Sequence, residues 1–276
     1  MTEPKAANLF DPSNPDVAKM ANVYEGRMVP VLFGPWAEDL VDRLGVRAGE
    51  AVLDVACGTG AVTRLLPSRV GEAGRVCGVD LNPAMIGIAR SIVPGVELKE
   101  GDATALPVAD GEFDVVLCQQ GLQFVPDKAA AVSEMARALK PGGRVGIASW
   151  KGPDENPVAA TMAASMEAAG WTEAAAGFAV PFSGGDPDEL EALLTQAGFE
   201  DVKVTRDEKI SVWPDVKAWV TEFAEVPPLA ANYLSADERT RAAYVDTTVD
   251  LLERFSRGAT HEIPWVASIA TGTKPT

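Results

Sequence analysis

Between residues 51 and 149 the chain alternates regularly between apolar segments of strand length and segments of helical periodicity. Strands are expected at 51–56, 75–80, 96–100, 113–118 and 144–149, with helices between them at about 61–66, 83–92 and 129–139. Strands joined by single helices imply right-handed crossovers and a parallel sheet, with ligands bound beyond the carboxyl ends of the strands. The pattern therefore predicts an α/β, Rossmann-like, mostly parallel sheet with helices on both faces.

The first expected strand ends in a glycine turn. The sequence AVLDVACGTGA, residues 51–61, passes from an apolar run through Gly58-Thr59-Gly60 into a helical pattern, and Asp54 lies just before the turn. Such a turn lets a ligand approach the main chain and presents helix N–H groups to it. Glycines also occur in strand-to-helix connections for purely steric reasons, so this turn alone does not identify a ligand.

Two helices are expected ahead of the first strand. One begins near Asp16, with Asn14 or Asp16 as its N-cap, and the other covers residues 35–44. Residues 1–15 are rich in Pro, Asn and Asp, and we expect them to be mobile or loosely docked. Elements placed before the first strand of such a fold lie over the sheet or over the ligand site. We therefore expect residues 1–45 to cover that site.

After residue 150 the alternation becomes irregular. Helices are expected at 157–170 and 187–198 and strands at 200–212 and 262–271, which brings the sheet to seven strands. Between the last two strands, residues 214–258 carry aromatic side chains at helical spacing, and we interpret them as a helical cap over the ligand edge, with plain core packing as the alternative. The expected division is a core of residues 46–213 and 259–276 with a cap of residues 214–258.

Composition narrows the class of protein. A formal net charge of −16 disfavours binding to nucleic acid or to an anionic membrane surface. Cys57, Cys77 and Cys118 lie in apolar segments without a CxxC pair, which is typical of reduced thiols in a cytoplasmic protein. His261 is the single histidine, so no metal site is expected. We also expect no signal peptide and no membrane span, because no charged segment precedes an apolar run and no run reaches about 18 residues.

Two acids follow neighbouring strands. Asp80 ends the second strand, 20 residues after Gly60, where a carboxylate offers two acceptor oxygens to a ribose diol. Asn82, just before a proline, is the better N-cap for the next helix, which leaves Asp80 for a ligand. One strand later, Asp102 could accept from an exocyclic amine while the main chain at Ala103 bonds a ring nitrogen. Together with the glycine turn, these acids fit an adenosine.

Four segments resemble successive motifs of the class I S-adenosylmethionine-dependent methyltransferases. They are LDVACGTG, GVDLNPAMIGIAR, GDATALPVADGEFDVVLCQQGLQFVPD and LKPGGRVGIASW, and the resemblance covers residues 46–150. It is closest to the small-molecule group that includes ubiquinone and menaquinone biosynthesis enzymes. A nicotinamide-type turn would carry a third glycine, which is absent after Gly60. The family's first glycine is Ala56 here, a change of one small residue for another that we expect to be tolerated.

The resemblance implies S-adenosylmethionine as cofactor and assigns its contacts residue by residue. From the methionine end to the adenine, the implied contacts are Asp54, Ala56, Gly58, Thr59, Gly60, Gln119, Gln120, Asp80, Leu81, Asp102 and Ala103. Asp80 would hold the ribose, Leu81 would pack on one adenine face, and Gln119 or Gln120 would face the methionine end. Tyr24, ahead of the first strand, is expected to close over the cofactor, with packing in the core as the alternative.

The residue that would act as a catalytic base is left unknown by the sequence. The sulfonium methyl is already activated, so a base is needed only where the acceptor must lose its proton early. Candidates are Tyr24, Glu25, Tyr233 and His261, although a lone histidine is more often structural. Gln123 lies where many relatives carry a histidine pair, and this departure removes the obvious imidazole base.

The leading hypothesis is methyl transfer to a small, apolar or aromatic acceptor at oxygen, nitrogen or carbon. The first alternative is an enzyme that keeps the cofactor as an electrostatic element while catalysing cyclisation or another reaction without transfer. The second is a cofactor-binding partner subunit without catalysis. The expected partner is a small molecule rather than nucleic acid or membrane, and a homodimer is left open.

Overall fold

A computed structural model of the protein describes residues 15–225 and 229–276. The expectations for the mobility of the N-terminal residues and for a cap at Asn14 fall on residues outside this range. The first helix, α1 (Pro15–Val23), begins ahead of Asp16, so Asp16 lies inside the helix and is not its N-cap.

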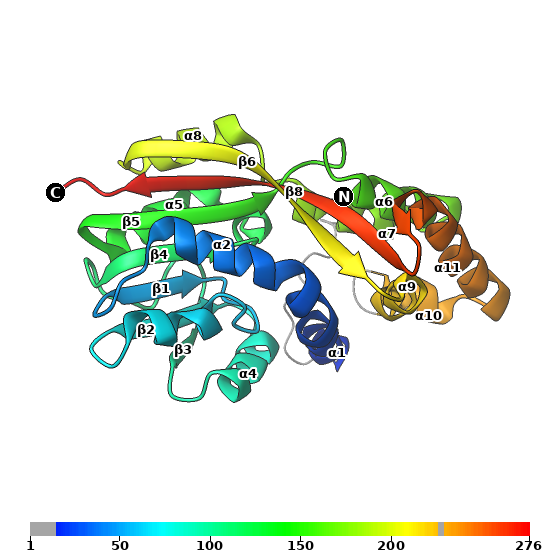
Figure 1. Ribbon diagram of the computed structural model, residues 1–276, viewed down its shortest axis with the longest axis horizontal. Coiled ribbons are helices and arrows are strands. Elements are labelled where there is room, and N and C mark those ends of the chain that lie inside the picture. Colours follow the sequence, from blue (N-terminus) through cyan, green and yellow to red (C-terminus); the bar gives the residue numbers. More distant parts are fainter. Residues whose placement is uncertain (1–14, 226–228) are drawn as a thin grey trace, which may run out of the picture.

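One sheet organises the molecule (Figure 1). Its strands are β1 (Ala51–Val55), β2 (Arg75–Asp80), β3 (Glu97–Glu100), β4 (Phe113–Gln119), β5 (Leu139–Trp150), β6 (Glu200–Trp213), β7 (Ser256–Arg257) and β8 (Thr260–Thr273). The order is β3-β2-β1-β4-β5-β8-β6, with β7 paired to β8. Strands β1 to β5 pair with one another in parallel, whereas β8 runs antiparallel to β5 and to β6. The mostly parallel seven-strand sheet is confirmed, and the two-residue β7 adds an eighth strand.

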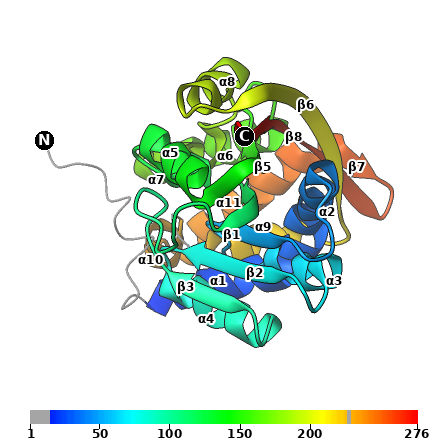
Figure 2. The ribbon, with the colours of Figure 1, turned by 90° about the vertical axis from the view of Figure 1, so that its left-hand side faces the viewer.

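Helices cover both faces of the sheet, as predicted. The helices that cover the sheet are α2 (Gly34–Leu44), α3 (Leu66–Val70), α4 (Pro83–Ile92), α5 (Lys128–Ala138) and α8 (Pro187–Gln196). Figure 2 shows α5 and α8 on one side of the sheet and α2 and α3 on the other. Neighbouring residues of one strand point to opposite faces, so Val52 packs in the same cluster as Leu40 of α2, while Leu53 packs with Met135 of α5. Full burial of such side chains contributes about 1.5–3 kcal/mol each.

The N-terminal helices are continuous, contrary to the two separate helices expected. A π-helix, η2 (Tyr24–Phe33), joins α1 to α2 and contains Gly26 and Pro30. Proline lacks an N–H and clashes with the carbonyl four residues earlier, which normally ends an α-helix. The wider π turn is seen where the Gly34 N–H bonds to the Val29 carbonyl, five residues back, and this widening accommodates the proline.

The glycine turn does not lead directly into an α-helix. Turn residues 57–62 are followed by a short 3-10 segment, η3 (Thr63–Leu65), and only then by the five-residue α3. Ala56, Gly58 and Gly60 all have positive φ angles, of 56°, 55° and 87°. The expectation that a helix N-terminus begins at the turn is therefore wrong. The N–H groups of Cys57 and Gly60 bond to the carbonyls of Val79 and Cys57.

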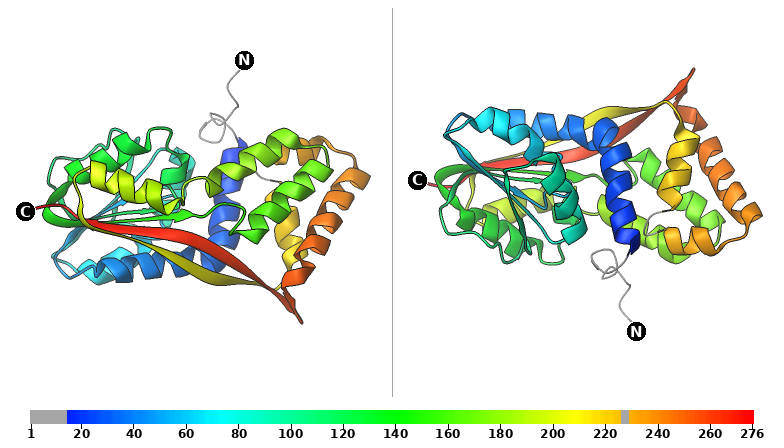
Figure 3. Two further views of the ribbon diagram at one scale, coloured as in Figure 1. Left: turned by 90° about the horizontal axis from the view of Figure 1, so that it is seen from above. Right: turned by 90° about the horizontal axis from the view of Figure 1, so that it is seen from below.

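A helical layer stands at one end of the sheet and is larger than the expected insertion. It contains α6 (Pro157–Ala168), α7 (Thr172–Ala179), α9 (Val216–Ala224), α10 (Ala230–Ser235) and α11 (Glu238–Leu252). Helix α11 packs against both α6 and α9, so α6 lies in the same layer as the helices of residues 214–258. Figure 3 shows β6 and β8 extending from the sheet into this layer. Three further 3-10 segments connect elements: η4 (Leu122–Phe124), η5 (Val180–Phe182) and η6 (Glu253–Phe255).

The strand order reverses between β1 and β4, so the loops that follow these two strands diverge. Ala56 follows β1 in the left-handed region, and Gly121 lies in the loop after β4. A methyl group on Gly121 would come within 2.4 Å of the Ala56 Cβ atom. The alanine at the family's glycine position is accommodated because its neighbour across the loops has no side chain.

This contact predicts the effect of Gly121→Ala on stability. The substitution should lower the free energy of unfolding by about 1–3 kcal/mol, the usual cost of overpacking. In an Ala56→Gly background the loss should be smaller, because the methyl group that causes the clash is absent. Gly87→Ala in α4 is the matched control, since a methyl there meets nothing within 4 Å. Urea unfolding measures all four variants, and an equal loss in both backgrounds would refute the contact.

Candidate active site

Asp80 closes the glycine turn. Its Oδ2 accepts a hydrogen bond from the Gly58 N–H at 2.8 Å, and its Oδ1 accepts one from the Asn82 N–H at 2.8 Å. Asn82 caps α4 by accepting from the Ala84 N–H at 2.9 Å, which confirms it as the N-cap. Asp80 is thus engaged by the main chain rather than free, although each carboxylate oxygen keeps a second lone pair for a ligand. Burial raises the pKa of Asp80, and the two N–H bonds oppose this shift.

Asp54 lies behind the turn and is almost completely buried, with 1% of its surface exposed. Its Oδ2 accepts a hydrogen bond of 2.5 Å from the Thr63 hydroxyl. Burial raises the pKa of Asp54 to about 7. The hydrogen bond from Thr63 lowers this pKa, and the charge of Asp80 raises it by a smaller amount. The site therefore contains two carboxyl groups whose charged form is disfavoured by burial, an arrangement that favours a cationic ligand.

Glu25 ties the N-terminal segment to the glycine turn. Its carboxylate accepts two hydrogen bonds from the Arg64 guanidinium, at 2.9 and 2.7 Å, and one from the Thr59 hydroxyl at 2.6 Å. Arg64 also donates to the Gly60 carbonyl at 2.9 Å. Bidentate, charge-assisted bonds of this kind are strong and geometrically specific. Glu25 is therefore an anchor of η2, and the structure does not present it as a base.

Tyr24 covers the turn. A Cβ atom placed on Gly58 would lie 4.0 Å from the Tyr24 ring, and this ring stacks on Phe33 with centroids 4.5 Å apart. Burial, and then the charge of Asp80, raise the pKa of the Tyr24 hydroxyl far above its ordinary value. The protonated form of the hydroxyl is therefore favoured, which makes Tyr24 unsuited to act as a base.

The expected adenine end lies along the same edge of the sheet. Strands β2 and β3 are parallel neighbours, so Asp80 and Asp102 follow adjacent strand ends. Leu81 is 51% exposed, a large apolar side chain with free surface for a flat ring. Asp102 accepts at Oδ1 from both the main-chain N–H and the hydroxyl of Thr104, at 2.8 Å each, which shapes the loop that contains Ala103.

Gln119 ends β4, and Gln120 and Gln123 follow it. The Gln119 amide donates to the Phe33 carbonyl at 2.9 Å, which attaches the end of η2 to the sheet. Gln123 donates to the Gln120 carbonyl at 3.0 Å and accepts from the Ser149 hydroxyl at 3.3 Å. Gln120 has a φ of 44° and is 6% exposed. Among the described residues, neither polar atom of its side-chain amide has a hydrogen-bond partner.

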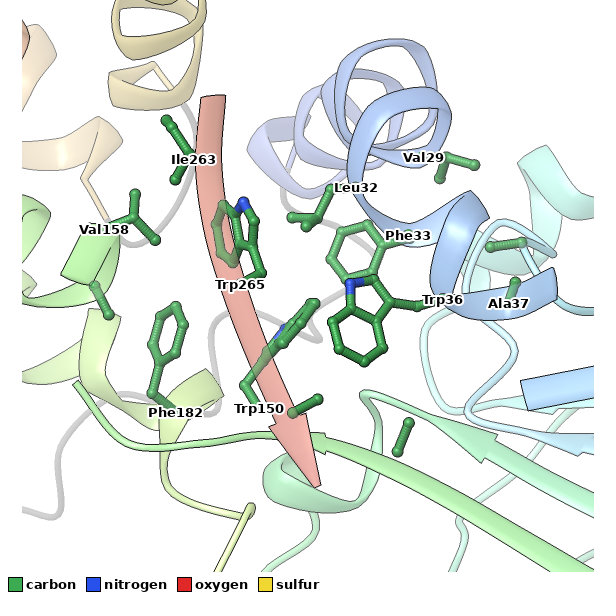
Figure 4. Packing of buried hydrophobic residues seen from close by; sticks show 14 of the residues in the cluster. Val29, Leu32, Phe33, Trp36, Ala37, Trp150, Val158, Phe182, Ile263 and Trp265 are labelled. Carbon is green, nitrogen blue, oxygen red and sulfur yellow. The ribbon is translucent and has the colours of Figure 1, made fainter. Parts of the chain in front are cut away.

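A cavity of about 200 Å³ lies between the N-terminal segment, the loop after β4 and the helical layer. Its walls are mainly aromatic and aliphatic, and in the described part of the chain its polar side chains come from Tyr24, Gln120 and Gln123. Trp150, at the end of β5, forms one wall. Figure 4 shows its indole between Phe33 and Trp36 on one side and Phe182 and Trp265 on the other. Trp150 lies 5.2 Å from Trp36 and 5.5 Å from Trp265 between ring centroids.

The structure does not bring the remaining candidate bases into this cavity. His261 lies at the start of β8, where its ring approaches Glu253 at 3.3 Å. Tyr233 packs in the cap against Trp171 and Tyr244, with ring centroids 6.3 and 6.1 Å away. Neither lines the cavity. Of the sequence candidates, only Tyr24 and Gln123 are at its wall.

The three cysteines are buried and form no disulfide. Over residues 15–225 and 229–276, no group of three or more potential metal-ligating side chains occurs, and no helix is long and apolar enough to cross a membrane.

The doubly wound sheet, the glycine turn at the reversal of strand order and the strand-end acids define a Rossmann-like protein with a nucleoside-binding edge. Residues 52–143 match the family model described as a methyltransferase domain. The chain is 36% identical over 182 residues to the 2-phytyl-1,4-naphtoquinone methyltransferase of Thermosynechococcus vestitus, an alignment that covers 61% of this chain and 80% of the relative. The chain belongs to the class I S-adenosylmethionine-dependent methyltransferases.

Other similarities cover less of the relative or show the fold alone. The demethylmenaquinone methyltransferase of Lactobacillus johnsonii is 40% identical over 129 residues, 45% of this chain and 52% of the relative. The chain thus spans about half the length of this relative and of a Klebsiella pneumoniae ubiquinone/menaquinone biosynthesis C-methyltransferase. A solved phosphoethanolamine N-methyltransferase 2 of Haemonchus contortus shares the fold with a TM-score of 0.61 and 18% identity, over 98% of this chain and 60% of that one.

The raised pKa of Asp54 predicts how stability depends on pH without cofactor. Asp54 ionises near 3.8 in the unfolded chain and near 7 when folded. Between these values the folded state holds the additional proton, so stability should fall as pH rises from about 4 to about 7. The raised pKa of Asp80 lowers stability over the same pH range. The variant Asp54→Asn therefore isolates the contribution of Asp54, and it should lose less stability between about pH 4 and about pH 7. Urea unfolding at a series of pH values measures both proteins, and parallel profiles would contradict the assignment.

Proposed function

We propose that this protein transfers the methyl group of S-adenosylmethionine to a small, largely apolar acceptor bound in the cavity. The observation that carries the proposal is the position of Tyr24, which covers the glycine turn at Gly58 and also lines the cavity. A ligand on the turn and a ligand in the cavity would therefore meet at one side chain. Family membership supports the cofactor, and the cavity walls support the acceptor.

The residues present fit the cofactor. S-adenosylmethionine combines a cationic methionine end, a ribose diol and a purine ring. The buried carboxyl of Asp54 suits the cationic end, the remaining lone pairs of Asp80 suit the diol, and the exposed Leu81 suits the purine face. Gly58 leaves the main chain open for close approach. When bound, the cofactor supplies a methyl group that is already activated on sulfur.

The chain's own contribution is positioning and exclusion of water. Trp150, Phe182 and Phe223 present flat apolar surfaces that hold a ring in place. Correct positioning of two reactants supplies a large part of the acceleration in a displacement of this kind. Several relatives are named for methylation of quinones, which supports a ring-containing acceptor. The three buried free cysteines support a reducing compartment, and we propose the cytoplasm.

The proposal is tested by incubating the protein with methyl-labelled S-adenosylmethionine and a panel of phenols, amines and quinones. Label should appear in an acceptor while S-adenosylhomocysteine forms in equal amount. Binding of the cofactor without any S-adenosylhomocysteine would refute methyl transfer. That outcome would leave a cyclisation-type reaction or a partner subunit as the remaining functions.

For the cofactor site, Asp80→Asn should weaken the binding of S-adenosylmethionine by about 1–3 kcal/mol, because a carboxylate that accepts from ligand hydroxyls is replaced by an amide that satisfies fewer of them. Glu100→Gln is the matched control, since Glu100 pairs with Asp80 in the register of β2 and β3 and is exposed. Isothermal titration calorimetry measures both dissociation constants. Unchanged affinity in Asp80→Asn would remove Asp80 from the cofactor site.

For the cap, Phe223→Ala should raise the acceptor KM about ten- to hundredfold, the equivalent of one buried aromatic contact of 1.5–3 kcal/mol. The dissociation constant of the cofactor should not change. Phe255→Ala is the matched control, because Phe255 packs in the same layer without lining the cavity. Steady-state kinetics measure the acceptor KM of both variants, and calorimetry measures their dissociation constants for the cofactor. An equal rise of KM in both variants would show that the cap does not bind the acceptor.

A further inference from the structure

Gln120 is the most unusual polar residue of the described chain. It follows β4 directly and adopts a φ of 44°, a left-handed conformation that L-residues other than glycine seldom hold without a reason. It is 94% buried, and both Nε2 and Oε1 lack a hydrogen-bond partner within the described residues. Backbone strain and an unpaired buried amide both oppose folding. Their coincidence at one residue on the wall of the cavity points to a ligand.

Gln123 and the amide nitrogen of Gln119 are engaged, whereas Gln119 Oε1 and, on the cavity wall, Trp219 Nε1 also have no hydrogen-bond partner among the described residues. The Gln123 amide bonds to the Gln120 carbonyl and to the Ser149 hydroxyl, and the Gln119 amide donates to the Phe33 carbonyl. The Gln120 main-chain N–H donates to the Ala148 carbonyl at 2.8 Å, which secures its backbone to β5. The backbone is therefore held in place, and Gln120 lines the cavity.

We propose that the Gln120 side chain binds the polar edge of the methyl acceptor through two parallel hydrogen bonds. Nε2 would donate to a carbonyl oxygen of the acceptor, and Oε1 would accept from an adjacent N–H or O–H group. The acceptor class is then a neutral aromatic ring system with a donor beside a carbonyl, as in a lactam. This inference rests on the proposed function only in taking the cavity as the acceptor site.

The cavity sets the size and charge of this ring system. An apolar cavity of about 150 Å³ accommodates benzene, so a cavity of about 200 Å³ suits one ring or two fused rings. Aromatic and aliphatic walls strip the hydration of a charged group without replacing it, which favours a neutral ligand. Trp150, Phe182 and Trp265 would enclose the ring faces while Gln120 binds the edge.

The experiment measures binding without cofactor, so that it does not depend on methyl transfer. The probes are 2-quinolone, which has an N–H beside a carbonyl, and naphthalene, which has the same two-ring shape without either group. Trp150, Trp219 and Trp265 line the cavity, so quenching of tryptophan fluorescence reports occupancy. Gln120→Met keeps the length of the side chain and removes its hydrogen-bonding groups. Gln196→Met, at the exposed end of α8, is the matched control.

We expect Gln120→Met to lower the affinity for 2-quinolone at least about tenfold while affinity for naphthalene stays the same. Gln196→Met should bind both probes as the unsubstituted protein does. The inference is overturned if Gln120→Met weakens both probes equally, if it weakens neither, or if neither probe binds the unsubstituted protein. Retained naphthalene binding also shows that the variant is folded.

The two proposals fail separately. Selective loss of 2-quinolone binding together with an absence of S-adenosylhomocysteine formation would leave Gln120 as a ligand-binding residue and refute only methyl transfer. If the protein transfers methyl groups but Gln120→Met binds 2-quinolone and naphthalene with equally changed or unchanged affinity, only the role of Gln120 is refuted.

Discussion

The bidentate contact between Glu25 and Arg64 is the interaction on which the arrangement of the site depends. It joins η2 to the glycine turn, and the hydroxyl of Thr59 donates a third hydrogen bond to the same carboxylate. Because Tyr24 directly precedes Glu25, this contact also holds the Tyr24 ring over the glycine turn. Further along η2, Phe33 forms a wall of the cavity. One partly buried ion pair thus fixes the position of the turn relative to the cavity.

The edge of the sheet concentrates negative charge in a poorly solvated place. Asp54 and Asp80 are both shifted toward the protonated form, chiefly by burial. The main-chain N–H groups of Gly58 and Asn82 donate hydrogen bonds that partly offset the burial of Asp80, and the Thr63 hydroxyl does the same for Asp54. A cationic ligand would relieve this cost, because an opposite charge nearby favours the carboxylate form. Binding of the cofactor and ionisation of the site are therefore expected to be linked.

Several parts of this architecture could be predicted from the sequence because their signals are local. The helix at 83–92 was expected with the bounds of α4, since Asn82 and the following proline form a clear N-terminal signal. The continuous π-helix through Pro30 was not expected, because proline ordinarily ends a helix and only packing holds the wide turn. Glu25 was considered as a base, since nothing in its neighbourhood along the chain shows the approach of Arg64.

The sequence by itself determined the strands of a mostly parallel α/β core, the glycine turn and the strand-end acid Asp80, because periodicity, glycine and capping residues act over a few positions. Only the tertiary structure decided which side chains enclose the cavity. Its walls come from segments as distant as Tyr24, Gln120, Trp150 and Trp265, and their meeting depends on burial of apolar surface between elements. The same long-range packing leaves His261 outside the cavity and places Gln120, whose amide has no partner among the described residues, on its wall.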